Sequence, residues 1–211
     1  MILIGQYDSP FVRRVAVTLN HYHMPFSRKP LSVFADKKEV QAVSPLIRVP
    51  VLILEDGETL VDSFAILDHL DHVVGPARAL MPHNGPDRRR MMQACVLATG
   101  ICEKILSLMF ERTNHDAAHI SKRFDERVVS QINAGLAKLE HDCGTPWFFD
   151  SKMTQADVTT GCMISFLKLR NPELFPADKY PKLHQLSRHC EMKEEFAEAR
   201  PGPNDTSPKK L

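Results

Sequence analysis

The sixteen residues from Arg48 to Ser63, RVPVLILEDGETLVDS, constrain the fold of this chain more than any other stretch. Val49 to Leu54 is an apolar run interrupted by a proline, and Glu55-Asp56-Gly57 supplies the turn residues of a tight hairpin. A short return strand follows from Glu58 to Val61, and the polar pair Asp62-Ser63 is typical of a helix N-terminus. The stretch therefore predicts a strand, a turn, a second strand and a helix start in immediate succession.

Pro50 is the unusual member of this stretch because it lies close to the start of a predicted strand. Proline removes a hydrogen-bond donor from the ladder, so its position suggests an edge, a turn or a cis peptide bond. A strand-start proline followed by a polar helix N-terminus presents one free backbone edge and one anion pocket side by side. That arrangement suits a small peptide-like ligand, whereas a purely structural hairpin is the alternative that the stretch by itself favours.

The composition is that of an ordinary soluble globular protein, with 43% apolar and 25% charged residues in a chain of 211. The formal net charge of +1 predicts no nucleic-acid partner and no attraction to an anionic membrane. We find no apolar stretch near the ~20 residues that span a bilayer, and the N-terminus lacks the features of a signal peptide. The five cysteines are odd in number and form no CxxC pair, which favours reduced, buried thiols and a cytoplasmic location.

The first 80 residues show the order β-α-β-α-β-β-α. Two strands joined by a helix are expected to be parallel through a right-handed crossover, whereas a turn at Asp56-Gly57 is short enough only for an antiparallel pair. The predicted topology is therefore that of an α/β thioredoxin-like domain, a mixed sheet with helices on both faces. The expected strands are residues 1–4, 26–31, 49–54 and 58–61, and the expected helices are residues 10–23, 35–43 and 62–74.

The first helix begins at Ser9-Pro10, with serine as the N-cap and proline at the first helical position. Its apolar periodicity places Phe11, Val15, Thr18 and Leu19 on the inward face. Arg13 and Arg14 are then expected off that face.

Residues 81–87 are rich in proline and glycine and are interpreted as a linker, after which the pattern changes to long helices. Met91, Cys95, Ala98 and Cys102 recur at helical spacing and start a sustained apolar stripe. TQAD at 154–157 is a capping box that opens a later helix. We expect two domains, residues 1–80 and an all-α helical domain of residues 88–211 with a frayed C-terminal tail.

Four motifs in order give the chain a resemblance to the cytosolic glutathione S-transferases. SPFVRRV at 9–15 resembles the first helix of serine-type, bacterial or plant-like members, and the segment at 44–71 resembles the family pattern NPxGKVPxLxxxxGxxLxES. LMP at 80–82 and TQADV at 154–158 match the exit from the first domain and the capping box of the second. Ile47 departs from this pattern, because the family usually has glycine there.

The resemblance implies a glutathione site in the first domain. The Val49 main chain, kept accessible by a cis Pro50, is implied to pair with the cysteinyl part of glutathione. Asp62 is implied to pair with the ammonium of the γ-glutamyl group, and Ser63 with the helix N-terminus to hold its carboxylate. Arg48 is implied to meet the glycyl carboxylate, with a simple surface charge as the alternative. Glutathione would be a co-substrate, and the family further implies a homodimer.

Catalysis by such an enzyme requires the glutathione thiolate, because the thiol is a poor nucleophile. A hydroxyl hydrogen bond to sulfur beside a helix N-terminus can lower the thiol pKa by about one to two units, at about 1.4 kcal/mol each. Ser9 stands at the required place, after the first strand and at the start of the first helix, and it can also serve as the N-cap. Tyr7 is the alternative donor, because tyrosine-type members carry their hydroxyl at the end of the same strand.

The acceptor site for a hydrophobic electrophile is expected between the domains, with Phe11, Met109 and Phe110 as candidates for an apolar wall. His115 and His119 have helical ligand spacing but no acidic partner motif, so we expect no metal site. The sequence favours a glutathione transferase of the detoxification type. The alternatives left open are a glutathione-dependent peroxidase or isomerase, and a non-catalytic binding or protein-interaction module. Thiol–disulfide exchange is disfavoured because no cysteine precedes Cys95.

Overall fold

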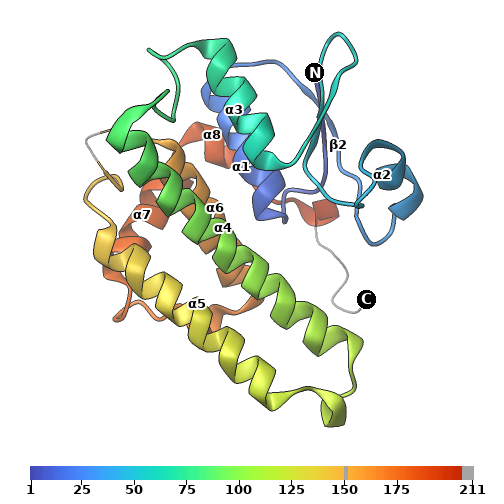
Figure 1. Ribbon diagram of the computed structural model, residues 1–211, viewed down its shortest axis with the longest axis vertical. Coiled ribbons are helices and arrows are strands. Elements are labelled where there is room, and N and C mark those ends of the chain that lie inside the picture. The colour runs from blue at the N-terminus through green and yellow to red at the C-terminus, as the bar shows by residue number, and fades with distance from the viewer. Residues whose placement is uncertain (150–151, 206–211) are drawn as a thin grey trace. The chain divides into compact units, whose positions relative to one another are not determined.

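The computed structural model describes residues 1–149 and 152–205 and contains two compact units (Figure 1). The first unit consists of Met1–Gly85 together with residues 191–205, and the second consists of Pro86–Cys190. The predicted domains were 1–80 and 88–211, so the units differ from them chiefly at the C-terminus, where residues 191–205 are part of the first unit. Within the predicted linker 81–87, helix α4 already begins at Gly85.

The first unit is built on a four-stranded mixed sheet with the order β2-β1-β3-β4. β1 pairs in parallel with β2 and antiparallel with β3, and β3 pairs antiparallel with β4. The predicted thioredoxin-like topology, followed by a helical unit, is confirmed. The strands are β1 (Ile2–Ile4), β2 (Ser27–Lys29), β3 (Val51–Ile53) and β4 (Thr59–Val61).

The strand register brings three connections to the same end of the sheet. Ile4, the last residue of β1, is paired with Val51, the first residue of β3. Val51 is in turn paired with Val61, the last residue of β4. Because β3 runs opposite to its two neighbours, the segment before it lies beside the segments that leave β1 and β4. Residues distant in sequence thus meet at one edge.

The helices of the first unit include residues from both ends of the chain. In Figure 1 the short helix α8 lies beside α1. The tail that we expected to fray is ordered as far as Asp205, which is 2% exposed, and the rest of it lies outside the described residues. The helices are α1 (Pro10–His21), α2 (Lys37–Val43), α3 (Ser63–Val74), α8 (Glu194–Glu198) and the 3-10 turn η3 (Pro203–Asp205).

The burial of Arg13 and Arg14 contradicts the predicted face of α1. Both side chains were expected off the inward face, yet they are 2% and 1% exposed. Periodicity alone assigns arginines to solvent, whereas here their guanidinium groups are held by polar partners from other parts of the first unit. The reason for their burial is therefore long-range in sequence.

The second unit is entirely helical among its described residues. The predicted capping box is confirmed, with Thr154 and Asp157 bonding each other's main-chain groups at the start of α6. We expected no apolar stretch long enough to span a bilayer, but α4 is long and apolar enough to do so by length and composition alone. A core helix of a globular protein meets the same criterion, and α4 contributes buried residues such as Ala98 and Ile105 to the second unit. The helices are α4 (Gly85–Asn114), η1 (Ala117–His119), α5 (Lys122–Asp142), α6 (Gln155–Arg170), η2 (Pro172–Leu174) and α7 (Pro181–Glu191).

Gly5 directly follows β1 and lies close to both α1 and the segment before β3. It has φ of +129°, and a Cβ atom at this position would lie 2.5 Å from Val12 Cγ2 and 3.0 Å from Val49 Cβ. A side chain is therefore excluded both by the backbone conformation and by the lack of space.

Gly5→Ala is expected to lower the free energy of unfolding by about 2–4 kcal/mol, because it combines an unfavourable φ with a steric clash. Gly100→Ala is the matched control, since a Cβ on this exposed residue of α4 meets nothing within 4 Å. The control is expected to gain up to about 1 kcal/mol. Thermal and urea unfolding followed by circular dichroism measure both values. Equal effects of the two substitutions would contradict the close approach at Gly5.

Candidate functional site

The candidate site is assembled at the edge of the sheet where Ile4, Val51 and Val61 are in register. The segment after β1 leads to the N-terminus of α1, and the segment after β4 leads directly to the N-terminus of α3. Pro50 immediately precedes β3. The three groups of residues predicted to form the glutathione site thus leave or enter the sheet at the same end.

The Val49–Pro50 peptide bond is cis, as the family resemblance implied. Pro50 is buried and Val49 is half-buried. Within the described residues, neither the amide nor the carbonyl of Val49 has a hydrogen-bond partner. These two groups can therefore pair with the main chain of an extended ligand, in the manner of an added strand.

The N-terminus of α3 lies next to this backbone edge and begins at Asp62-Ser63. Asp62 is exposed, has φ of 76°, and accepts a hydrogen bond from the Phe64 amide through Oδ1 at 2.8 Å. With ψ of 135° this backbone lies outside the left-handed helical region that aspartate tolerates well, so it is strained, and such conformations gather at ligand sites. The first-turn amides and the helix dipole make this end of α3 favourable for a carboxylate.

Ser63 is linked to α1 by Arg14, a buried arginine that was not among the predicted site residues. Arg14 donates a hydrogen bond from Nη2 to Ser63 Oγ at 2.8 Å, and its guanidinium lies 4.2 Å from the centre of the Phe64 ring. Since the Ser63 oxygen accepts this bond, its own hydroxyl hydrogen remains available to an anion. Ser63 is itself only 1% exposed. The adjacent arginines in SPFVRRV were visible in the sequence, but no neighbouring residue indicated that Arg14 would contact Ser63.

Ser9 is the N-cap of α1 and is half-buried. Its Oγ accepts a hydrogen bond from the Val12 amide at 3.4 Å, which is long for such a bond. The predicted capping role is therefore present, and the O–H hydrogen is left over for a further acceptor. Three residues of α1 separate Ser9 from Arg13, whose amide donates to the Ser9 carbonyl at 2.9 Å. Ser9 thus lies at the positive end of the helix.

Tyr7, the alternative donor, lies in a more enclosed position than Ser9. It is 6% exposed, and the Arg28 guanidinium lies 3.5 Å from the centre of its ring. Burial raises the pKa of Tyr7 above its ordinary value, and the positive charge of Arg28 only partly opposes this. The phenol therefore stays protonated and largely covered by its neighbours.

Arg48 is exposed next to the site, and its amide bonds Ser44 Oγ at 3.2 Å. The adjacent Ile47 has φ of 52°, in the left-handed region. The family usually has glycine at this position, and glycine adopts a left-handed conformation without a penalty. Isoleucine is β-branched and adopts it only at an energetic cost. The turn is held by the Ile47 amide, which bonds the Ser44 carbonyl at 2.8 Å.

The three residues proposed for an acceptor wall belong to different units. Phe11 is half-buried on α1 of the first unit, whereas Met109 and Phe110 are on α4 of the second. Phe110 is 40% exposed and Met109 is half-buried. Their role in an acceptor site stays a prediction.

The cysteines and the metal-binding side chains offer no alternative centre in the described part of the chain. All five cysteines are buried in the second unit and no disulfide joins them. Burial raises the pKa of the Cys143 thiol to about 12, which makes it a poor nucleophile. No group of three or more His, Cys, Asp or Glu that could hold a metal ion occurs among the described residues.

Comparison with known proteins identifies the family to which this chain belongs. Residues 3–77 match the family model of the glutathione S-transferase N-terminal domain, and residues 124–189 match that of the C-terminal domain. The chain is therefore a member of the glutathione S-transferase family. It is 27% identical over 201 residues to the uncharacterized GST-like protein YibF of Escherichia coli (strain K12), covering 95% of this chain and 98% of YibF.

Two solved structures are similar over nearly the whole chain. A glutathione S-transferase of Methylobacillus flagellatus KT with glutathione bound has a TM-score of 0.88 and 25% identity, covering 95% of this chain and 99% of that one. A glutathione S-transferase of Methylobacterium radiotolerans JCM 2831, in complex with glutathione sulfonate, has a TM-score of 0.88 and 29% identity, covering 95% of this chain and 94% of that one. Both relatives were solved with glutathione or a derivative of it.

Ile47→Gly is expected to change the free energy of unfolding by about 1 kcal/mol or less, because release of the left-handed strain offsets the lost side chain. Ile53→Gly is the matched control, since Ile53 is a half-buried isoleucine within β3. That substitution is expected to cost about 3 kcal/mol or more. Thermal unfolding midpoints compare the two variants, and a loss in Ile47→Gly as large as in the control would contradict strain at this turn.

Proposed function

We propose that this protein is a glutathione transferase that ionises the glutathione thiol for attack on hydrophobic electrophiles. The observation that carries the proposal is the meeting of three features at one sheet edge: the unbonded main chain of Val49, the helix start at Asp62-Ser63, and the hydroxyl of Ser9. The glutathione-bound relatives support glutathione as the ligand of such a site. Glutathione would serve as co-substrate and no metal would take part.

Glutathione would lie along this edge of the sheet, and the charges at its two ends would fix its direction. Its γ-glutamyl carboxylate would lie at the N-terminus of α3, with Ser63 beneath it and its ammonium at Asp62. Its cysteinyl main chain would pair with Val49, and its glycyl carboxylate would extend towards Arg48. These contacts are polar and directional, so they favour a tripeptide with two terminal anions over an apolar ligand.

Ser9 is the residue that we assign to the sulfur. Its hydrogen is not used in capping, because its oxygen accepts the bond from Val12, so the hydroxyl can donate to a thiolate. The helix N-terminus adds a favourable field for the anion. Stabilisation of the thiolate by about 1.5–3 kcal/mol would lower the thiol pKa by about one to two units from ~8.5. Tyr7 is a weaker candidate because it is almost fully covered.

Our proposals for the acceptor and for the physiological role are supported by the family and by the residues already named. A hydrophobic electrophile would meet the wall of Phe11, Met109 and Phe110, where methionine adapts to acceptors of varied shape. Detoxification in the cytoplasm is the role that such a chemistry serves. A peroxidase or isomerase reaction would use the same thiolate, and a non-catalytic module would retain only the binding contacts.

Loss of the Ser9 hydroxyl tests the catalytic assignment. Ser9→Ala is expected to raise the pKa of bound glutathione by about one to two units and to lower turnover of an aromatic halide about 10–100-fold near neutral pH. Affinity for glutathione, measured by calorimetry, is expected to stay within a few-fold because Val49 and Asp62 are untouched. Ser9→Thr keeps both the hydroxyl and the cap, and it is the control for helix capping.

One outcome would contradict this function, and a second would contradict the assignment of Ser9. If millimolar glutathione fails to raise the unfolding midpoint of the unmodified protein, the site does not bind glutathione and all glutathione-dependent reactions are excluded. If Ser9→Ala retains full activity while Tyr7→Phe loses it, the activating hydroxyl belongs to Tyr7.

We also propose that the protein is a homodimer and that α4 and α5 supply the contact. A groove of about 1420 Å³ runs along these two helices in the second unit. Val96 is 48% exposed in it, and apolar neighbours such as Leu97 and Ile101 line it as well. Its basic lining residues are Arg88, Arg89, Arg90, Lys104 and Lys138.

Val96→Arg is expected to shift the protein from dimer to monomer in light scattering at micromolar concentration, because it adds a positive charge to a contact that already holds five basic side chains from each copy. Leu169→Arg is the matched control, because Leu169 is 49% exposed on α6 and lies outside the groove. The control is expected to leave the molecular mass unchanged. A protein that is monomeric before substitution would contradict the dimer.

A further inference from the structure

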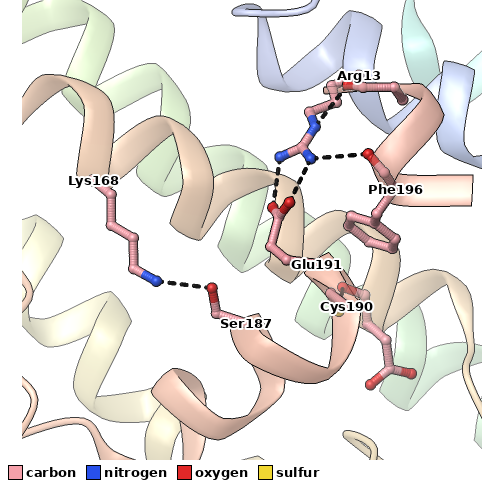
Figure 2. Close-up of polar contacts among 8 residues, drawn as sticks. Arg13, Lys168, Ser187, Cys190, Glu191 and Phe196 are labelled. Carbon is pink, nitrogen blue, oxygen red and sulfur yellow. Dashed lines mark hydrogen bonds and ion pairs between the residues drawn. The ribbon is translucent and has the colours of Figure 1, made fainter. Parts of the chain in front are cut away.

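Arg13 ties the beginning of α1 to residues from the other end of the chain. Its guanidinium nitrogens Nη1 and Nη2 donate to the two carboxylate oxygens of Glu191 at 2.9 and 3.0 Å (Figure 2). Nη2 also reaches the Phe196 carbonyl at 3.3 Å, and Nε donates to the Ala199 carbonyl at 3.0 Å. A bidentate, charge-assisted pair with further main-chain acceptors holds both partners in a single geometry.

Asp205 makes a second attachment on the other side of Ser9. It is 2% exposed, and its Oδ1 accepts a hydrogen bond from the Tyr7 amide at 3.1 Å. The same oxygen forms an ion pair with Arg28, whose guanidinium covers the Tyr7 ring. The other oxygen, Oδ2, accepts a hydrogen bond from the Gly202 amide at 2.9 Å. A buried carboxylate with these partners fixes the loop that leads from β1 into α1.

The two attachments lie on either side of Ser9, at residues 7 and 13. Ser9 connects to both through its main chain: its amide donates to the Gln6 carbonyl at 3.2 Å, and its carbonyl accepts the Arg13 amide at 2.9 Å. Within the described part of the chain, its side chain takes part in a single hydrogen bond, which Oγ accepts from the Val12 amide at 3.4 Å. The direction of the Ser9 hydroxyl therefore depends on how firmly this backbone is held.

We propose that residues 191–205 act as a strap that positions Ser9 for thiolate stabilisation, with Asp205 and Glu191 as positioning residues. This proposal rests on the function proposed above, in which Ser9 donates to the glutathione sulfur. Neither carboxylate touches the ligand; each acts through the backbone of the β1–α1 loop or of α1. A hydroxyl displaced by about 1 Å loses most of its hydrogen bond to sulfur, so the strap governs ionisation of the thiol.

The strap is expected to affect ionisation and not affinity. The groups assigned to glutathione binding, at Val49 and Asp62, lie before β3 and after β4 and are held by the sheet register. Loosening the strap would therefore leave the ligand in place while moving only the hydroxyl. A merely structural role of the strap would lower stability without changing the pKa of the bound thiol.

The test uses the full chain with glutathione bound and follows the ultraviolet absorbance of the thiolate as a function of pH. Asp205→Asn keeps the size of the side chain but removes its charge, and Glu191→Gln does the same at the Arg13 attachment. Each variant is expected to raise the pKa of bound glutathione by about 0.5–1 unit, a three- to tenfold loss of thiolate at pH below the pKa. The Kd for glutathione is expected to stay within twofold.

Glu195→Gln is the matched control. Glu195 belongs to the same strap and pairs with His21 at 3.1 Å, at the far end of α1 from Ser9. It is expected to leave the thiol pKa unchanged. If Asp205→Asn fails to fold, Glu191→Gln alone carries the test.

Combination with Ser9→Ala separates failure of the strap from failure of the proposed function. The double variant Ser9→Ala/Asp205→Asn is expected to have the same thiol pKa as Ser9→Ala, because the strap acts only through that hydroxyl. A further rise in the double variant overturns the strap proposal, as does a lower unfolding midpoint with no change of pKa in either single variant. If Ser9→Ala itself leaves the pKa unchanged, both proposals are wrong.

Discussion

The register of a very small sheet is the constraint on which the rest of the first unit depends. Because Ile4, Val51 and Val61 are aligned across three strands, the start of α1, the cis proline segment and the start of α3 lie at one edge. A shift of one residue in this pairing would turn every side chain to the opposite face. The proposed glutathione site therefore depends first on the strand pairing, which brings its parts together, and only then on the individual polar residues.

Two adjacent buried arginines on α1 connect this edge to the remainder of the unit. Arg14 reaches Ser63 at the start of α3, whereas Arg13 reaches Glu191 and the carbonyl groups of the C-terminal strap. A buried guanidinium is costly unless its donors find acceptors, so both contacts specify where their partners must lie. The same helix therefore contacts the start of α3, where we propose that the γ-glutamyl carboxylate binds, and carries Ser9 at its own N-terminus.

The elements of the fold were largely predictable from sequence because their signals are local. The hairpin turn at Asp56-Gly57, the Ser9-Pro10 helix start and the capping box at Thr154 each act within a few residues. The topology then followed from the order of the elements and from the short turn, which permits only an antiparallel pair. The burial of Arg13 was not predictable, since its partners lie some 180 positions away and an arginine by itself indicates solvent. The prediction of a frayed tail was wrong as far as Asp205, because the partners of Asp205 are likewise distant in sequence.

The most direct test of the proposed site is a crystal structure of the protein with glutathione at saturating concentration. The proposed arrangement predicts the sulfur within hydrogen-bond distance of Ser9 Oγ, the cysteinyl main chain paired with Val49, and the γ-glutamyl carboxylate at the N-terminus of α3. A sulfur atom closer to the Tyr7 hydroxyl than to Ser9, or a tripeptide bound away from this sheet edge, would contradict it.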